Sequence, residues 1–142
     1  MDKLLVSACL LGAPCRYDGK SKPLAGIERL REMYELVPVC PEQEGGLPTP
    51  RTPSERRGEA VVMQDGTDVT AQYRRGAEAA LALCRREGCA AALLKERSPS
   101  CGSGAIYDGS FTHTLIPGDG VTAELLRQNG VRIYGESELD LL

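Results

Sequence analysis

The chain has 142 residues, enough to bury one hydrophobic core and too few for two domains of ordinary size. Its formal net charge of -3 and isoelectric point near 5.3 exclude the strongly basic surface that binds long nucleic acid. Because the sequence contains neither a membrane-spanning apolar stretch nor a signal-peptide pattern, we expect a cytoplasmic protein with no membrane partner and one domain, residues 1–142.

The first part of the chain predicts two strands, each followed by a cysteine. Residues 3–8 form a short apolar run that leads into a loop beginning at Cys9. Apolar residues then recur at helical spacing between residues 27 and 34, and residues 36–39 predict a second strand that ends at Cys40. Cys9 and Cys40 are therefore expected at equivalent places in the fold.

The middle of the chain predicts a long loop and then the clearest helix of the sequence. Prolines and glycines between residues 41 and 58 rule out a long helix or a central strand there. A loop of this length inside a compact domain is usually functional or disordered. Residues 59–63 predict a strand or hairpin arm, and Asp68 can then cap a helix that ends near Gly88.

The last part repeats the alternation of strand and helix. Residues 89–94 predict a third strand, followed by a turn-rich loop that contains Cys101. Residues 106–115 predict a hairpin or irregular structure, residues 121–129 a helix, and residues 131–134 a fourth strand. The alternation predicts a compact α/β domain with a mainly parallel sheet flanked by helices in Rossmann-like layers, with ligand sites beyond the carboxyl ends of the strands.

Three cysteines, Cys9, Cys40 and Cys101, each follow a predicted strand and could share one metal centre at that edge of the sheet. The spacing contains no Cys-x-x-Cys pair, and the single histidine, His113, is expected to be a surface or loop residue, so the usual zinc motifs fit poorly. Soft thiolates favour zinc or an iron-sulfur cluster. Three thiolates on a 4Fe-4S cluster would leave one iron open to a substrate sulfur atom.

The remaining cysteines leave alternatives open. Cys84 lies on the apolar stripe of a predicted helix and Cys89 begins a predicted strand, so both are expected in the core. Cys15 lies near Cys9 and could be a fourth ligand, a reactive thiol or a buried residue. The alternative functions are a non-catalytic zinc or iron-sulfur module with Cys15 as a ligand, and a sulfur carrier or redox sensor that uses Cys15 or Cys101.

Two other side chains lie close in sequence to the candidate ligands. Glu42 follows Cys40, and Ser98 precedes Cys101. A carboxylate beside a metal centre can act as a general acid or base, and a hydroxyl can orient a substrate or relay a proton. Without the cysteines, Glu42 would be interpreted as a solvated loop residue and Ser98 as a turn or cap residue.

The sequence also resembles a bacterial family whose studied members are 2-thiouracil desulfidases. The resemblance extends from residue 6 to residue 130 and depends on several motifs in a fixed order. These motifs are Val6-Ser-Ala-Cys-Leu-Leu-Gly12, Cys15-Arg-Tyr-Asp-Gly19, Val39-Cys-Pro-Glu42, Gly45-Gly-Leu-Pro-Thr-Pro-Arg51, Asp68-Val-Thr70, and residues 95–104 with Ser98-Pro-Ser-Cys-Gly102.

The resemblance implies an α/β domain that binds a 4Fe-4S cluster through Cys9, Cys40 and Cys101, with Glu42 and Ser98 as catalytic residues. It implies a non-redox reaction in which the sulfur of a thiolated pyrimidine binds the open iron and Glu42 activates water, while Ser98 holds the ring or passes a proton. The expected products are uracil and hydrosulfide. The expected partner is a small thiolated pyrimidine, and the chain could form a homodimer.

Overall fold

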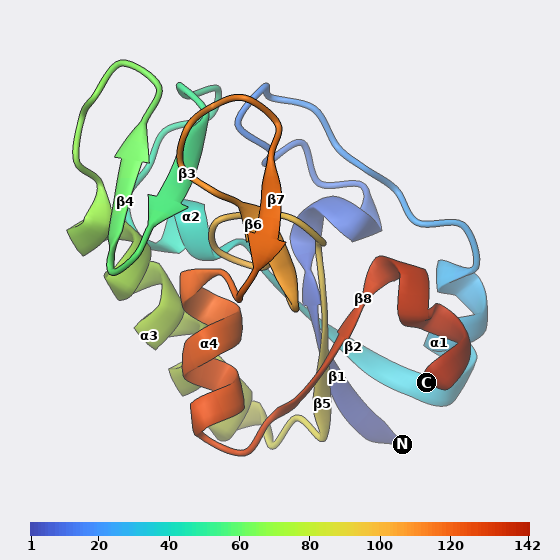
Figure 1. Cartoon of the computed structure of the whole chain (residues 1–142). Helices are drawn as coiled ribbons and strands as arrows, with labels where there is room; N and C mark the ends of the chain where they lie inside the picture. The colour runs from blue at the N-terminus through green and yellow to red at the C-terminus, as the bar shows by residue number, and fades with distance from the viewer.

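The computed structural model describes residues 1–142 and contains a four-stranded parallel sheet (Figure 1). The strands are β1 (Asp2–Ser7), β2 (Tyr34–Val39), β5 (Ala91–Leu94) and β8 (Arg132–Gly135), in the order β2-β1-β5-β8. These are the four apolar runs that predicted strands, so the expected α/β class with a parallel sheet is confirmed. The central position of β5 explains its sequence, because all four of its residues are buried.

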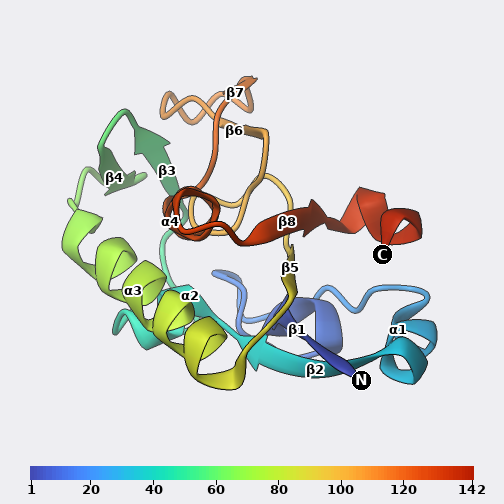
Figure 2. The same cartoon turned by 90° about the horizontal axis from the view of Figure 1, so that it is seen from below.

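Helices cover both faces of this sheet (Figure 2). On one face lie α3 (Thr70–Glu87) and α4 (Val121–Gln128). On the other face lie η1 (Ala8–Leu11), α1 (Ile27–Met33) and η2 (Glu136–Leu141), of which only α1 was predicted. None of the helices combines the length and the apolar character needed to cross a bilayer.

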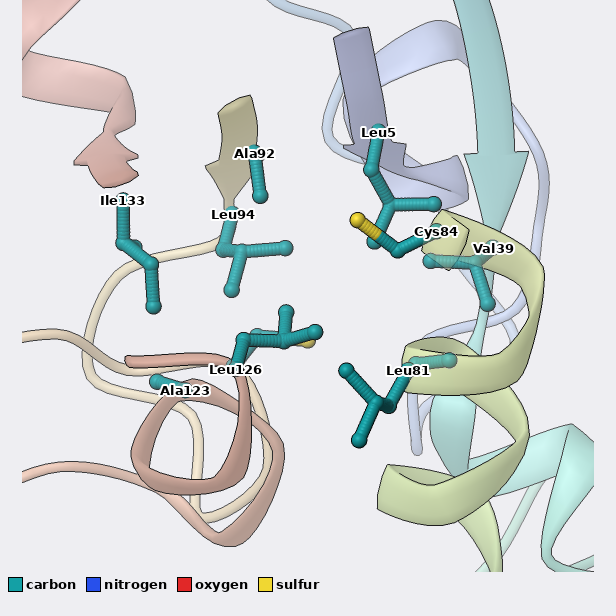
Figure 3. Packing of buried hydrophobic residues seen from close by; sticks show 11 residues of the cluster. Leu5, Val39, Leu81, Cys84, Ala92, Leu94, Ala123, Leu126 and Ile133 are labelled. Carbon is teal, nitrogen blue, oxygen red and sulfur yellow. The ribbon is translucent and has the colours of Figure 1, made fainter. Parts of the chain in front are cut away.

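Aliphatic side chains fill the core between the sheet and α3 and α4. Leu5 and Leu94 project from the central strands towards Leu81 of α3 and Leu126 of α4 (Figure 3). Cys84 belongs to the same cluster and is 3% exposed, which confirms its predicted place in the core. This layer fixes α3 against the sheet, and α3 in turn supports the loop that follows β2.

Two antiparallel hairpins and one short helix lie outside the main sheet. The first hairpin joins β3 (Ser54–Arg57) to β4 (Ala60–Met63), and the second joins β6 (Ala105–Tyr107) to β7 (Leu115–Pro117). The hairpin alternatives for both regions are therefore confirmed. The proline-rich segment contains only the short helix α2 (Pro41–Glu44) and the side strand β3, in agreement with the absence of a long helix or central strand.

The start of α3 differs in detail from the prediction. Val69, not Asp68, occupies the N-cap position, and no side chain caps the helix there. The Asp68 carboxylate instead accepts a hydrogen bond of 2.8 Å from the backbone N–H of Thr70, as Asp does in a local turn. The helix ends as predicted, because Gly88 adopts the left-handed conformation with φ of 67°.

The order of the strands reverses at β1, and this reversal predicts where on the sheet a ligand would bind. From β1 the chain crosses to β2 on one side, and the later strand β5 lies on the other side. In sheets of this kind, ligands bind beyond the carboxyl ends of the strands at such a reversal. Ser7 at the end of β1 accepts a hydrogen bond of 2.9 Å from the backbone N–H of Lys95 after β5, and this contact fixes the two strand ends together.

Candidate functional site

A cavity of about 400 Å³ lies beyond the carboxyl ends of the parallel strands. This volume is within the range of small-molecule sites. The sequence-predicted site residues all line it, namely Cys9, Cys40, Cys101, Glu42 and Ser98, and Cys15 lines it as well. The fold therefore brings together side chains from three separate loops.

Each thiol reaches the cavity from a different part of the backbone. Cys9 lies in η1 directly after β1, and Cys40 is the N-cap residue of α2 directly after β2. Cys101 lies in the loop after β5 and is 4% exposed. The thiol of Cys40 donates a weak hydrogen bond of 3.8 Å to the backbone oxygen of Cys15, so the loop after η1 folds back onto α2.

The other two cysteines lie elsewhere. Neither Cys84 nor Cys89 lines the cavity. Cys89 precedes β5, which begins at Ala91, and it is only half-buried, so its prediction as the first residue of the strand was wrong. The helix α3 ends at Glu87, and the two residues before β5 are therefore a connection.

The protonation of the cavity thiols depends strongly on their surroundings. The pKa of Cys101 is raised to about 12, chiefly by burial and in smaller part by the nearby Glu42 and Cys40. A hydrogen bond with Cys15 is the main cause of the raised pKa of Cys40, and burial adds to it. Without a bound cation or cluster, Cys40 and Cys101 hold their protons at neutral pH and are poor nucleophiles, which counts against a carrier or sensor based on a Cys101 thiolate.

The donor set fits an iron-sulfur cluster better than a single metal ion. All four cysteines of the cavity are free thiols, and thiolates are the preferred ligands of iron-sulfur clusters. No three His, Cys, Asp or Glu side chains gather closely enough to hold one metal ion. A zinc ion needs all its ligands at about 2.3 Å from one centre, whereas a cluster distributes its cysteines over several irons. The all-thiol donor set is therefore the type that an iron-sulfur cluster uses.

The two carboxylate oxygens of Glu42 differ in how many hydrogen bonds they accept. Its Oε2 accepts hydrogen bonds from Arg51 Nη2 at 2.6 Å, Arg51 Nε at 3.0 Å and the Tyr73 hydroxyl at 3.2 Å. Its Oε1 has a single long contact, 3.5 Å from the Ser98 hydroxyl. The side chain is thus held rigidly through Oε2 while Oε1 faces Ser98.

Arg51 and Tyr73 are functional candidates that the sequence analysis did not identify. The Arg51 side chain is 3% exposed and also donates a hydrogen bond of 3.1 Å to the backbone oxygen of Cys15. Burial alone would lower the pKa of Arg51, but Glu42 outweighs it and the pKa is raised. Burial, followed by the charge of Glu42, raises the pKa of Tyr73. Arg51 ends one of the family motifs, which is the one available signal. Tyr73 lies within the helix predicted between Asp68 and Gly88, and nothing in the sequence marks it as a site residue.

Ser98 is positioned by the backbone of its own loop. Its hydroxyl oxygen accepts hydrogen bonds from the N–H groups of Ser100 at 3.1 Å and Cys101 at 3.0 Å. With its oxygen occupied by two donors, the hydroxyl proton is free to point towards Glu42 Oε1 or a bound molecule. The same contacts fix Ser98 relative to Cys101.

Two glycines allow α2 to approach α3 closely enough to place Glu42 beside Tyr73. A Cβ atom at Gly76 would lie 1.9 Å from the backbone oxygen of Pro41. A Cβ atom at Gly45 would lie 2.0 Å from the backbone oxygen of Gln72. Any larger residue at either position must push the two helices apart.

The hairpin between β6 and β7 supplies the last part of the cavity wall. Tyr107 and His113 both line the cavity. His113 is an exposed loop residue, as the sequence analysis expected, but it also faces this site.

Comparison with known proteins gives a consistent result. Residues 4–138 match the model of a family described as 2-thiouracil desulfurase. The uncharacterized protein YbbK of Bacillus subtilis (strain 168) is 43% identical over 147 residues, which cover 96% of this chain and 97% of YbbK. A solved structure of the [4Fe-4S]-dependent thiouracil desulfidase TudS is 51% identical, covers 100% of this chain and 95% of its own, and superposes with a TM-score of 0.95.

Proposed function

The chain belongs to the 2-thiouracil desulfurase family, and we propose that it is a [4Fe-4S]-dependent desulfidase that removes sulfur from a thiolated pyrimidine, 2-thiouracil or a close relative. The observation that carries the proposal is the cavity at the strand ends, which is lined by free thiols and by a carboxylate whose Oε1 accepts only one long hydrogen bond, 3.5 Å from Ser98. The strong likeness to TudS over the whole chain supports it.

We propose that Cys9, Cys40 and Cys101 hold the cluster. Each follows a strand of the parallel sheet, and each lines the cavity. When bound, a cluster with three protein ligands supplies an open, Lewis-acidic iron for the sulfur atom of the substrate. Cys15 lines the same cavity, so an experiment must decide whether the cluster has three cysteine ligands or whether Cys15 is a fourth.

Glu42 is the proposed general base. Since Oε2 already accepts three hydrogen bonds, Oε1 is the atom that can take a proton from a water molecule. The water oxygen would form a bond to the thiocarbonyl carbon, the carbon–sulfur bond would break, and the products would be uracil and hydrosulfide. Arg51 and Tyr73 hold the carboxylate in position for this step, and such proton transfer contributes about 10²–10⁴ in rate.

Ser98 is the proposed orienting hydroxyl. Its oxygen accepts two backbone N–H groups, so it offers its proton to the substrate ring or to Glu42 Oε1. A fixed donor of this kind needs no reorganisation during the reaction.

We also propose that residues 1–142 act as one desulfidase domain. All the proposed site residues come from loops of the same sheet, which supports this assignment. We place the protein in the cytoplasm, where its six free cysteines would stay reduced, and we retain a homodimer as a prediction for solution measurements.

The test is anaerobic reconstitution with iron and sulfide, followed by iron determination and an assay for conversion of 2-thiouracil to uracil. The variants are Cys9→Ser, Cys40→Ser, Cys101→Ser and Cys15→Ser, with Cys89→Ser as a matched control outside the cavity. We expect about four irons per chain and turnover in the wild type, Cys15→Ser and the control, and loss of both in the other three.

The alternatives give different results. Loss of the cluster in Cys15→Ser, without turnover in any variant, would favour a closed, non-catalytic module. Turnover that survives removal of iron would favour a cysteine-based sulfur carrier. Iron binding without conversion of 2-thiouracil would retain the cluster site and reject this substrate.

A further inference from the structure

The loop between β6 and β7 carries an aromatic pair into the wall of the cavity. Tyr107 ends β6, and His113 lies across the loop shortly before β7. Their ring centroids are 5.8 Å apart and the rings meet at 84°, an edge-to-face arrangement. Both residues line the same cavity as the cysteines and Glu42. This arrangement gives the polar, sulfur-lined site one aromatic wall.

The backbone of this loop is held in a defined and strained conformation. Both Phe111 and His113 have φ of 59°, in the left-handed region that residues other than glycine rarely adopt. Such outliers cluster at ligand clamps and persist only where neighbouring contacts enforce them. The first hairpin supplies those contacts.

The contact between the two hairpins depends on a buried carboxylate. Glu55 of β3 is 9% exposed, and its Oε1 accepts hydrogen bonds from the N–H groups of Gly109 at 2.9 Å and Phe111 at 3.1 Å. Arg57 Nε donates a hydrogen bond of 2.6 Å to the backbone oxygen of Gly109. The loop is therefore fixed before any ligand binds.

The other aromatic side chains of the cavity are less suited to contact a ligand face. Tyr73 is 2% exposed, and its hydroxyl is engaged with Glu42. The ring of Tyr17 is partly covered by the guanidinium of Arg16, 6.0 Å from its centroid. Of the two exposed aromatic side chains of the cavity, Tyr17 and His113, His113 is the one that a second ring, Tyr107, braces.

We propose that the pyrimidine ring of the substrate stacks on the Tyr107–His113 pair and that His113 is a substrate-binding residue. This inference rests on the proposed function. The edges of a thiolated pyrimidine carry its hydrogen-bonding groups and its sulfur, whereas its faces need a planar apolar contact. Stacking fixes the plane of the pyrimidine ring. The edges of the ring then remain free to contact Ser98 and the side of the cavity that the thiols line.

The kinetic test compares His113→Asn with His113→Phe in the cluster-loaded enzyme. Asn tolerates the left-handed conformation, and Phe111 already adopts it in the same loop, so neither change should disturb the backbone. Loss of the ring in His113→Asn should raise KM for 2-thiouracil roughly tenfold, in the range of base–aromatic stacking, with kcat within about twofold. His113→Phe should keep KM close to the wild-type value.

The exposed Ile116 of β7 provides a control on the same hairpin outside the cavity. Ile116→Ala should leave KM unchanged. Iron content and circular dichroism should be the same in all these variants.

A binding measurement that needs no turnover uses the single histidine of the chain. The holoenzyme with ¹⁵N-labelled imidazole gives one set of histidine NMR signals, and titration with uracil should shift them to saturation. Unchanged KM in His113→Asn together with an unshifted imidazole signal would overturn the stacking role while leaving the desulfidase intact. Absence of wild-type turnover would overturn both proposals.

Discussion

The buried ion pair between Arg51 and Glu42 should be the most sensitive polar contact of the site. Arg51 is 3% exposed and Glu42 is 15% exposed, and the shortest contact between them is 2.6 Å. Arg51→Met removes the guanidinium, retains much of the apolar side chain and leaves a carboxylate without its charged partner. Breaking a buried pair in this way costs about 3–5 kcal/mol, and the residual exposure of Glu42 places the expected loss near the lower end.

The measurement is urea unfolding of the cluster-free, reduced protein, followed by circular dichroism and extrapolated linearly to water. The surface pair of Arg31 with Glu28 provides the control, because these side chains are 47% and 83% exposed. Arg31→Met should change the unfolding free energy by less than about 1 kcal/mol. The double variant Arg51→Met/Glu42→Gln should recover part of the loss, since it leaves no unpaired charge.

A loss below about 1 kcal/mol in Arg51→Met would refute this reasoning, because that is the value of a solvent-exposed ion pair. A double variant no more stable than Arg51→Met would show that the cost comes from the hydrogen bond to Cys15 and the surrounding loop, and not from the unpaired charge.

Three further predictions follow from the structure. Glu42→Gln should lower kcat by about 10²–10⁴ with unchanged iron content, as measured by the 2-thiouracil assay and iron determination. Gly76→Ala should destabilise the fold by about 1–3 kcal/mol in urea unfolding, because its Cβ would lie 1.9 Å from the Pro41 oxygen, whereas the exposed Glu78→Ala should have little effect. Burial, and then Cys84, raises the pKa of Cys89 to about 11, so the thiol loses its proton at lower pH in the unfolded chain than in the folded one. The free energy of unfolding should therefore fall between pH 9 and 11, and this fall should be smaller in Cys89→Ala than in the wild type.

Each of these predictions has a contrary outcome. Full activity in Glu42→Gln would show that the Glu42 carboxylate is not the general base. A wild-type stability for Gly76→Ala would mean that α2 can move away from α3 at little cost. Equal alkaline losses in the wild type and Cys89→Ala would assign the pH dependence to other groups.

The parallel sheet could be predicted because its signals are local. The runs that became β1, β2, β5 and β8 are short and apolar, and α3 shows a clear apolar stripe and a terminal glycine. The convergence of Cys9, Cys40 and Cys101 then follows from topology, since the carboxyl ends of parallel strands share one edge.

The polar network around Glu42 could not be predicted, because it depends on contacts between distant and irregular segments. Tyr73 is 31 residues from Glu42 along the chain, and a position within a helix does not by itself show which distant side chain it contacts. Arg51 reaches Glu42 from a proline-rich loop that carries no periodic pattern. His113 likewise faces the cavity from a loop that is held by a distant contact, the hydrogen bond from the Phe111 N–H to Glu55, 56 residues earlier in the chain.

The local backbone couples each proposed catalytic side chain to a proposed cluster ligand. Cys40 and Glu42 belong to the same short turn, and the position of that turn on α3 is set by the close approach at Gly76. Ser98 is joined to Cys101 by a hydrogen bond of 3.0 Å from the Cys101 N–H. A shift of either loop would therefore move ligand and catalytic group together. Because each catalytic side chain and its neighbouring ligand belong to one turn of the backbone, that turn sets the distance between them. The site therefore needs no domain closure to assemble.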